Sequence, residues 1–396
     1  MRALLLFLAA ANALAQSGPQ VQLSHTAENL RGVSAVSRQI AWASGSHGTY
    51  LRTVDAGRTW TPAQVPGAEA LDFRAVVAFS AAEAFLMSAG PGDQSRIYHT
   101  SDAGQHWQPQ FTNSNPKGFF DCMAFWDRTH GIVLGDPVPD ESGKLKFEIL
   151  LTTDGQTWTQ MPQSQLPPAA EGEAAFAASN FCLTILTNGS EKRGPSAPEP
   201  NIWFATGGHV ARVFHSPDLG RTWQVFDTPI THGPDSAGIF SVAFRDATHG
   251  VIVGGDYKHP NQDGDNLAFT SDGGKTWTLP QIRPQAYFSA VAYGRNYSKA
   301  LSSRPENLVP LREEIRGGRT CCAPTPATFA KNLNENQAAP RLFIVAPEFI
   351  FDFRPPHDPT RISPGKKSPT RFNAVSPYPD GGALFVGPNG SIATIP

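Results

Sequence analysis

The sequence predicts an all-β fold made of a repeated unit of four strands, and two periodic features of the chain lead to this prediction. The first is a motif, S/T-x-D-x-G-x-T/H-W, that lies between two short strand-like runs each time it occurs. The second is an apolar run that opens each repeat. The 36 glycines and 35 prolines also favour a turn-rich chain of strands over long helices. Copies of the motif occupy residues 53–60, 100–107, 216–223 and 270–277, and a copy at 153–158 is one residue shorter between its Asp and its Trp.

Each copy of this motif, called a box below, predicts a hairpin turn. The Asp carboxylate can accept hydrogen bonds from backbone N–H groups two residues on, and the Gly can adopt a positive φ. The Trp begins the outgoing strand and offers a large apolar face for packing between neighbouring sheets. Because the same turn recurs along the chain, we expect its residues to fix geometry rather than to perform chemistry. This structural role is assigned to Asp55, Trp60, Asp102, Trp107, Asp154, Trp158, Asp218, Trp223, Asp272 and Trp277.

The boxes resemble the Asp-box, or BNR, repeat of sialidase-like β-propellers. The wider repeat, which covers roughly residues 20–293 and 371–396, is similar to the photosystem II stability/assembly factor family and its bacterial relatives. The resemblance implies a closed β-propeller of four-stranded blades. It also implies a role in protein binding or assembly, and, through the more distant sialidases, a glycoside hydrolase as the alternative.

The apolar openings predict seven blades, and the two chain ends predict how the ring closes. Residues 21–25 lead into the first opening without a box before them, while residues 390–395 form a third strand with nothing after it. We therefore expect the N-terminal strand to complete the C-terminal blade, which removes exposed sheet edges. Residues 16–396 would form one propeller domain, in which 294–370 is an irregular, degenerate blade or an insertion. The openings lie at residues 31–36, 73–79, 120–125, 174–178, 239–244, 287–291 and 371–375.

Residues 1–15 have the pattern of a secretory signal peptide. Arg2 supplies the positive start, an apolar core follows, and Ala13 and Ala15 form a small-x-small cleavage site. No later run reaches the ~18 apolar residues of a spanning helix. We expect an exported, monomeric protein, periplasmic or extracellular, that is cleaved near Ala15. With 32 basic and 34 acidic residues and no basic tract, the chain does not have the charge pattern of a nucleic-acid-binding protein.

The cysteines leave two interpretations open, and no motif points to a cofactor. Cys122 and Cys182 fall in apolar runs of successive repeats, so they could form an inter-blade disulfide in an oxidising compartment or remain buried thiols. Cys321 and Cys322 are adjacent, and a bridge between neighbours is strained. There is no zinc-type spacing of Cys and His and no G-x-G-x-x-G after a strand. We expect no metal and no cofactor.

A site is expected on the face opposite the boxes, where long loops are held by a rigid scaffold. Arginines facing the channel could hold a carboxylate or phosphate, and we assign ligand binding to Arg74, Arg96, Arg212 and Asp121. Acidic side chains there could instead act as general acid and base in glycoside hydrolysis. That alternative uses Asp136, Glu173, Asp256 and Tyr257. In a third interpretation these acids and arginines neutralise one another between blades.

Two functions follow from these expectations. The first is a binding or assembly module that recognises a protein partner or a small ligand on the loop face. The second is a sialidase-like glycoside hydrolase, which would need an arginine triad, an early Arg-Ile-Pro segment and a Tyr/Glu nucleophile pair. The chain has no Arg-Ile-Pro, and the related run at residues 361–364 is late and lies in the irregular stretch. The binding module is therefore the prediction and the hydrolase its alternative.

Overall fold

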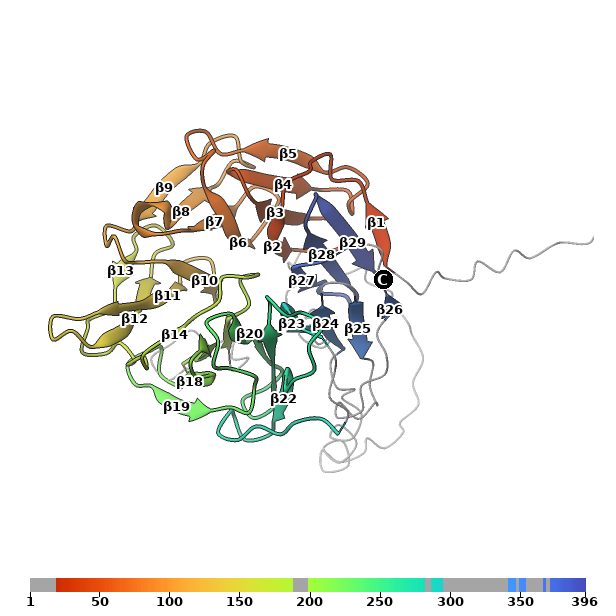
Figure 1. Ribbon diagram of the computed structural model, residues 1–396. Coiled ribbons are helices and arrows are strands. Elements are labelled where there is room, and N and C mark those ends of the chain that lie inside the picture. Colours follow the sequence, from red (N-terminus) through yellow and green to blue (C-terminus); the bar gives the residue numbers. More distant parts are fainter. Residues whose placement is uncertain are drawn as a thin grey trace, which may run out of the picture.

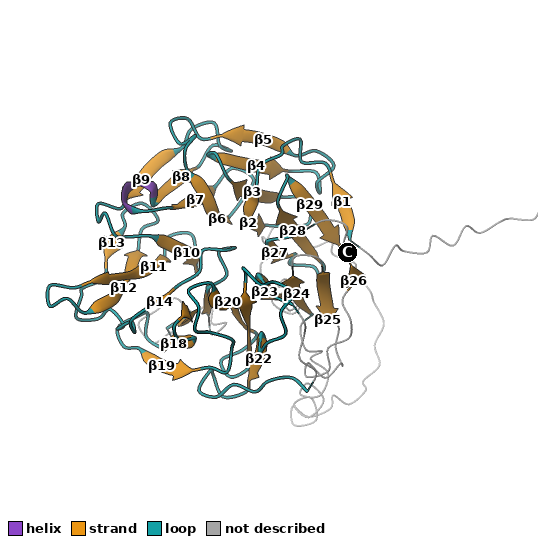
Figure 2. Ribbon diagram, in the orientation of Figure 1, coloured by secondary structure: helices purple, strands orange, loops and turns teal. Residues whose placement is uncertain are grey.

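The computed structural model describes residues 19–187, 199–281, 286–294, 341–346, 349–353, 366–367 and 371–396. The predicted signal peptide, Cys321, Cys322 and most of the irregular stretch 294–370 lie outside the described residues. Figure 1 shows sheets arranged radially around a common central axis. Figure 2 shows that the described chain consists almost entirely of strands and loops, with a short 3-10 helix η1 (Gly92–Gln94). The predicted all-β propeller is confirmed.

The described residues form seven antiparallel sheets. The first three each contain four strands that follow one another in the chain, as the box repeats predict. Sheet one contains β2 (Leu30–Ala35), β3 (Ala41–Gly45), β4 (Thr49–Thr53) and β5 (Thr61–Gln64). Sheet two contains β6 (Asp72–Ala78), β7 (Ala84–Ala89), β8 (Arg96–Thr100) and β9 (Gln108–Thr112). Sheet three contains β10 (Phe120–Phe125), β11 (Gly131–Pro139), β12 (Leu145–Thr152) and β13 (Thr159–Gln160).

Sheets four and five are less regular. Sheet four contains β15 (Leu183–Leu186), β16 (Asn201–Ala205), β18 (Arg212–Ser216) and β19 (Gln224–Asp227). Sheet five has five strands, because two short ones, β14 (Glu173–Ala174) and β17 (Gly207–Gly208), pair beside β20 (Ala237–Phe244), β21 (Gly250–Asp256) and β22 (Leu267–Thr270).

Sheets six and seven bring the two ends of the chain together. Sheet six contains β23 (Ala290–Tyr293), β24 (Leu342–Ala346), β25 (Phe349–Phe353) and β26 (Lys366–Lys367), so parts of the irregular stretch 294–370 form strands. Sheet seven contains β27 (Ala374–Pro377), β28 (Ala383–Gly387), β29 (Ser391–Ile395) and β1 (Gln20–Gln22). Val21 pairs with Ala393. The N-terminal strand therefore completes the C-terminal sheet, as predicted.

The core is divided among the junctions between neighbouring sheets. One apolar cluster fills the junction of sheets one and two, and six others fill the remaining junctions, including the one between sheets seven and one. Trp60 and Trp158 are buried in two of them, as the box motif predicts. Each sheet thus buries both of its faces against neighbours, and the hydrophobic effect that holds the ring is distributed around it.

The box turns have the expected position but a different hydrogen-bond pattern. They connect the third strand to the outermost segment in sheets one to five. In box 53–60, the Asp55 carboxylate accepts the Thr59 N–H, four residues on, at 2.9 Å. The Thr53 hydroxyl donates to Asp55 at 2.8 Å and accepts the Gly57 N–H. The expected bond two residues on occurs in the shorter box, where Gln156 N–H donates to Asp154. The extra residue in the longer boxes moves the donor further along the chain.

One predicted opening is wrong. Residues 174–178 do not begin sheet four, whose innermost strand begins at Leu183. After β14 the chain leaves the sheets and crosses the channel, so the apolar run is buried by the channel walls rather than by strand pairing.

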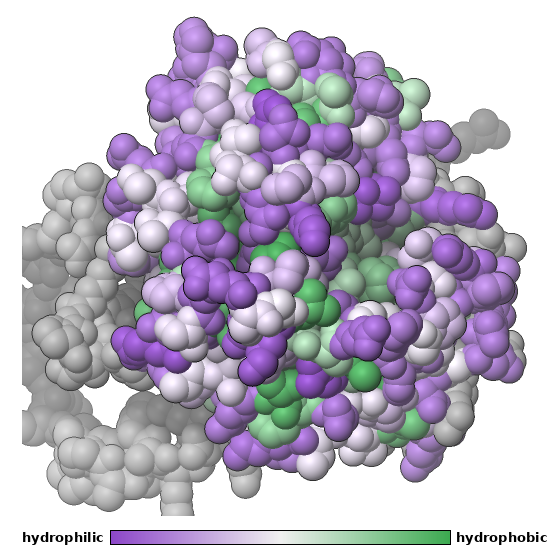
Figure 3. Space-filling model, turned by 60° about the vertical axis from the view of Figure 1, so that its left-hand side comes forward, coloured by the Kyte–Doolittle hydropathy of each residue, from purple (hydrophilic) through white to green (hydrophobic). Residues whose placement is uncertain are grey.

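The outer surface is mainly polar. On the face seen in Figure 3, hydrophobic residues come to the surface only in small patches between hydrophilic ones. None of the described residues belongs to a helix with the length and apolarity needed to span a bilayer.

Candidate functional site

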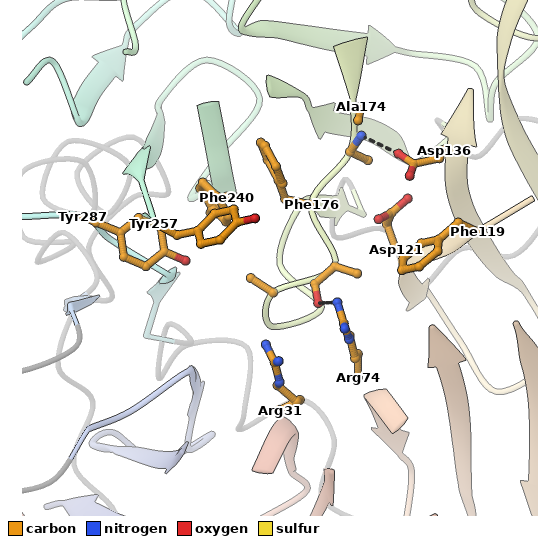
Figure 4. Close-up of a pocket in the computed structure, with 13 residues that line it drawn as sticks. Arg31, Arg74, Phe119, Asp121, Asp136, Ala174, Phe176, Phe240, Tyr257 and Tyr287 are labelled. Atoms are coloured by element: carbon orange, nitrogen blue, oxygen red, sulfur yellow. Dashed lines mark hydrogen bonds between the residues drawn. The ribbon is translucent and has the colours of Figure 1, made fainter. Parts of the chain in front are cut away.

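A pocket of about 540 Å³ opens at one end of the central channel, where the innermost strands begin (Figure 4). It has three chemically different walls. Arg31 and Arg74 form a cationic wall, and Asp121 and Asp136 form an acidic wall. Aromatic rings form the third wall and come from Phe176, Phe240, Tyr257 and Tyr287, while the ring centroid of Phe119 lies 5.9 Å from the guanidinium carbon of Arg74. The boxes lie at the other end of the same strands, since Ala35, Ala41 and Thr53 pair in register.

Strand bulges explain why these side chains point into the channel. In four sheets the pairing of the innermost strand shifts by one residue near its start. A bulge leaves one residue unpaired and redirects its side chain. The bulged residues are Arg31, Arg74, Asp121 and Phe240, and all four line the pocket. In these four sheets the repeat therefore presents one variable side chain each on an otherwise regular frame.

The two arginines of the cationic wall differ in their partners. Arg74 Nε lies 2.9 Å from Asp72 Oδ2, and its Nη1 donates to the Ala177 carbonyl at 3.2 Å. Arg31 makes no hydrogen bond or ion pair with the residues that the structure describes, and its Nε is buried. Burial lowers the pKa of Arg31, and the charge of Arg74 lowers it further. A guanidinium remains charged at neutral pH despite such shifts, so Arg31 is a positive charge available to a ligand.

The acidic wall contains one buried carboxyl group, Asp121, and one partly exposed residue, Asp136. Asp121 is 1% exposed; the Ala177 N–H donates to its carboxylate, and Oδ2 has no hydrogen-bond partner among the described residues. Burial raises the pKa of Asp121, with a further contribution from Asp136. Asp136 Oδ1 accepts the Ala175 N–H at 2.9 Å. Burial raises the pKa of Asp136 to about 7, and the nearby Glu148 contributes. Both carboxyls therefore hold protons far more readily than exposed ones.

The segment 174–181 crosses the channel and closes the pocket on one side. Its backbone supplies the N–H groups bound by Asp136 and Asp121 and the carbonyl bound by Arg74. Further along, the Ser179 hydroxyl donates to the Ser289 carbonyl in front of β23, at 2.9 Å. Cys182, which directly follows the segment, is bridged to Cys122 on β10. Of the two interpretations of this cysteine pair, the structure has the disulfide. The hydrogen bond of Ala175 and the disulfide of Cys182 therefore fix the segment near both of its ends.

The aromatic wall extends from sheet five to sheet six. Phe176 stacks on Phe240 with ring centroids 4.1 Å apart, and Phe240 meets Tyr287 edge-on at 4.8 Å. Tyr257, at the end of β21, is 49% exposed and stands at the rim. Burial raises the pKa of Tyr287. A smaller hollow of about 180 Å³ shares Arg31 and Tyr287 with the pocket and reaches Arg371 and Asn373 of sheet seven.

The structure brings together half of the site residues predicted from the sequence. Arg74, Asp121, Asp136 and Tyr257 line the pocket, whereas Arg96, Glu173, Arg212 and Asp256 do not. Glu173 is fully buried and forms a bidentate pair with Arg212, with Nε to Oε1 at 3.0 Å. Arg96 Nε donates to the Asp93 carbonyl, and Asp256 lies 2.8 Å from His259 Nδ1. The ion pair between Glu173 and Arg212 agrees with the interpretation in which acids and arginines neutralise one another between blades.

Sequence reasoning missed Arg31, Tyr287 and the aromatic rings of Phe176 and Phe240 as site residues. A signal for Arg31 and Phe240 was present. Both precede the small residue of an apolar opening, which is the position that Arg74 and Asp121 occupy in their own repeats. No such signal existed for Phe176, because the crossing of the channel depends on the tertiary structure. Within the described residues, no three His, Cys, Asp or Glu side chains gather as ligands of a metal ion.

The chain is similar in fold to solved structures at low sequence identity. A structure described as "YCF48 bound to D1 peptide" is 14% identical, with a TM-score of 0.56 and coverage of 97% of this chain and 98% of that one. U3-55K is 11% identical, with a TM-score of 0.58 and coverage of 96% and 99%. The GH74 xyloglucanase from Xanthomonas campestris is 14% identical, with a TM-score of 0.54, and the match covers 95% of this chain and 53% of the enzyme. No family model and no curated protein matches the chain. The similarities therefore establish the β-propeller fold, and the fold alone.

Proposed function

We propose that this protein is an exported binding module that recognises a peptide of a partner protein, or a small ligand, in the pocket at the channel mouth. The observation that carries the proposal is that one pocket contains the guanidinium of Arg31 and the carboxyl of Asp121, and that each has a buried polar atom without a partner among the described residues. A protein seldom buries charged groups unless they are paired or have a functional role. The similarity to a propeller solved with a bound peptide supports this proposal.

The finer parts of the proposal concern the ring and the location of the protein. The seven sheets support a seven-bladed propeller. Cleavage near Ala15 and export to the periplasm or the extracellular space rest on the sequence pattern of residues 1–15. The bridge between Cys122 and Cys182 supports an oxidising compartment. A monomeric state is part of the same proposal.

The experiment selects peptides from a display library on the mature protein, residues 16–396, and measures their affinities. We expect Arg31→Gln to weaken the selected peptides at least tenfold. Arg58→Gln serves as the matched control, because Arg58 lies in a box turn at the opposite end of the strands. Peptides that bind both variants equally well would show that binding occurs elsewhere and would contradict the proposed site.

A glycoside hydrolase is the second candidate, because Asp136 combines a pKa of about 7 with a place in the pocket next to a second carboxyl, Asp121. A carboxyl with a raised pKa can act as a general acid near neutral pH. Turnover of fluorogenic glycosides that is lost in Asp136→Asn would favour the hydrolase. Absence of turnover in a cooperatively folded protein would leave the binding module.

A further inference from the structure

We propose that the pocket takes a zwitterionic ligand of the amino-acid type, with its carboxylate on Arg31 and its ammonium group on Asp121. The ligand would be a free amino acid or a short peptide with an apolar side chain. This inference rests on the proposed binding function and specifies the chemistry of the same site. It is argued from the three walls of the pocket.

The cationic wall requires an anionic group. Arg31 has no partner among the described residues, whereas Arg74 is already engaged by Asp72 and by the Ala177 carbonyl. The two guanidinium groups line the same pocket, and their like charges repel each other. A carboxylate placed against Arg31 would relieve this repulsion and could accept two parallel hydrogen bonds. Arg31 is therefore the anchor for the anionic end of the ligand.

The acidic wall requires a hydrogen-bond donor, and preferably a cation. Asp121 is 1% exposed and faces the pocket, and its Oδ2 is buried without a described partner. An unsatisfied buried acceptor is costly, by about 1–3 kcal/mol in typical proteins. Asp136 on β11 makes no hydrogen bond with this oxygen, and its own Oδ1 accepts the Ala175 N–H. An ammonium group from a ligand would satisfy Asp121.

A ligand with a single charge satisfies only one of these walls. Figure 4 shows the arginines on one side of the pocket and the two carboxyls on another. An anion without an amino group would leave Asp121 unsatisfied and would lie close to two carboxyl groups. An amine without a carboxylate would face two guanidinium groups. A zwitterion pairs with both walls, and desolvated pairs of this kind confer specificity because the wrong charge is strongly disfavoured.

The aromatic wall and the size of the pocket define the body of the ligand. Phe176, Phe240 and Tyr287 present apolar ring surface beside the charged walls. Aromatic rings favour an apolar or aromatic side chain through packing and edge-to-face contacts. The volume of about 540 Å³ lies within the range of pockets for small molecules, about 300–1,000 Å³. It has room for an amino acid or a short peptide but not for a folded domain.

Binding of an ammonium group should displace protons from the acidic wall. The groups that face Asp121 are Asp136 on β11, Glu148 on β12, Arg74 on β6 and the Ala177 N–H of the crossing segment. In the free protein, burial and the neighbouring acids raise the pKa of Asp121. A bound ammonium favours the ionised carboxyl, so the proton leaves when the ligand binds. Proton release therefore distinguishes an ammonium on Asp121 from a neutral donor.

The test is calorimetric titration of the mature protein with three probes: phenylalanine, alanyl-phenylalanine and alanyl-phenylalanyl-alanine. Each probe is used free, N-acetylated and C-amidated. We expect at least one free probe to bind and each cap to weaken it at least tenfold. Acetylation should have no further effect in Asp121→Asn, and amidation should have none in Arg31→Gln. Arg58→Gln should retain the wild-type pattern. Titrations in buffers of different ionisation enthalpy should show proton release with the free probe only.

The outcomes separate this inference from the proposed function on which it rests. If free and capped probes bind with equal affinity and Arg31→Gln weakens both, the pocket binds peptides but does not recognise a zwitterion. That result would contradict this inference and leave the proposed function intact. Failure of every free probe to bind at millimolar concentration would also overturn this inference, even if selected library peptides bind. Cap effects that persist unchanged in Asp121→Asn and Arg31→Gln would show that the ends of the ligand are recognised elsewhere.

Discussion

At the scale of single residues, four of the side chains that line the pocket occupy the same position in their own sheets. The bulge in the innermost strand directs Arg31, Arg74, Asp121 and Phe240 towards the channel, although they belong to four different sheets. The neighbouring positions of the same strands are buried in the junctions between sheets. We therefore expect a substitution at a bulged position to change the chemistry of the pocket more than it changes the fold.

The raised pKa of Asp136 predicts a pH-dependent stability. The pKa in the folded state is about 7, above the unfolded value of 3.8, so the folded protein binds a proton that the unfolded chain releases. The free energy of unfolding should therefore fall as the pH rises from about 4 to about 7 and stay lowered above that range. A shift of about three units corresponds to at most about 4 kcal/mol. We expect Asp136→Asn to be more stable than the wild type at pH 8, with a difference that vanishes towards pH 4.

Urea denaturation between pH 4 and pH 9 measures this effect. Asp93→Asn is the control, because Asp93 is a largely exposed carboxylate outside the pocket. The Asn side chain retains the oxygen that accepts the Ala175 N–H, so the backbone of the crossing segment keeps its hydrogen bond. Parallel pH profiles for the wild type and Asp136→Asn would contradict burial of this carboxyl in the folded state.

At the scale of the element, the box turns owe their shape to residues that tolerate unusual backbone angles. Gly104 has a φ of +86°, and a Cβ there would lie 2.6 Å from the Tyr50 hydroxyl oxygen. The Tyr50 hydroxyl in turn donates to the Gly104 carbonyl at 2.8 Å. The turn of one blade is thereby fixed against a strand of the preceding blade. The box is therefore an inter-blade contact as well as a hairpin.

Substitution of Gly104 should show how much of the loss in stability comes from backbone strain and how much from the contact with Tyr50. Ala at a positive φ destabilises by about 1 kcal/mol or more. We expect Gly104→Ala to cost more than Gly67→Ala, because Gly67 also has a positive φ, +78°, but open space around its Cβ position. Equal losses of unfolding free energy in thermal or urea denaturation would show that the Tyr50 contact contributes nothing to stability.

At the scale of the whole molecule, the ring is closed by β1 on β29, and a disulfide connects two neighbouring sheets within the described part of the chain. The bridge between Cys122 and Cys182 closes a loop with a sequence separation of 60 residues and connects sheet three to the segment in front of sheet four. In the chain-entropy description, a disulfide that closes a loop of this length stabilises the folded protein by about 4 kcal/mol, because it restricts the unfolded chain. The bridge also fixes the end of the segment that crosses the channel, so we expect it to affect the pocket.

The double variant Cys122→Ala and Cys182→Ala should therefore unfold at lower urea concentration than the wild type. The loss should approach about 4 kcal/mol, reduced by whatever structure the unfolded chain retains. Cys122→Ala alone should lose the same amount, since either change removes the bridge. A double variant as stable as the wild type would show that the bridge does not constrain the unfolded chain.

The repeat, the all-β class, the position of the boxes between strands and the closure of the ring by the N-terminal strand could all be predicted from the sequence. Each of these follows from local patterns, because turn residues and apolar alternation act over a few residues. The sequence also identified Arg74, Asp121, Asp136 and Tyr257, which lie at strand ends near the channel. The predicted hydrogen bond of the longer boxes was wrong, because the Asp carboxylate accepts the N–H four residues on and not the one two residues on. The turn-forming tendency of Asp does not determine which N–H its carboxylate reaches.

Only the tertiary structure decided which charged residues face one another. Glu173 and Arg212 are 39 positions apart and neutralise each other, whereas Arg31 and Asp121 share a pocket although they lie in sheets one and three. The path of residues 174–181 across the channel was equally hidden, since an apolar run looks the same whether it is buried in a sheet or in a channel. Burial and charge pairing depend on neighbours brought together from distant parts of the ring, and these decide the chemistry of the pocket.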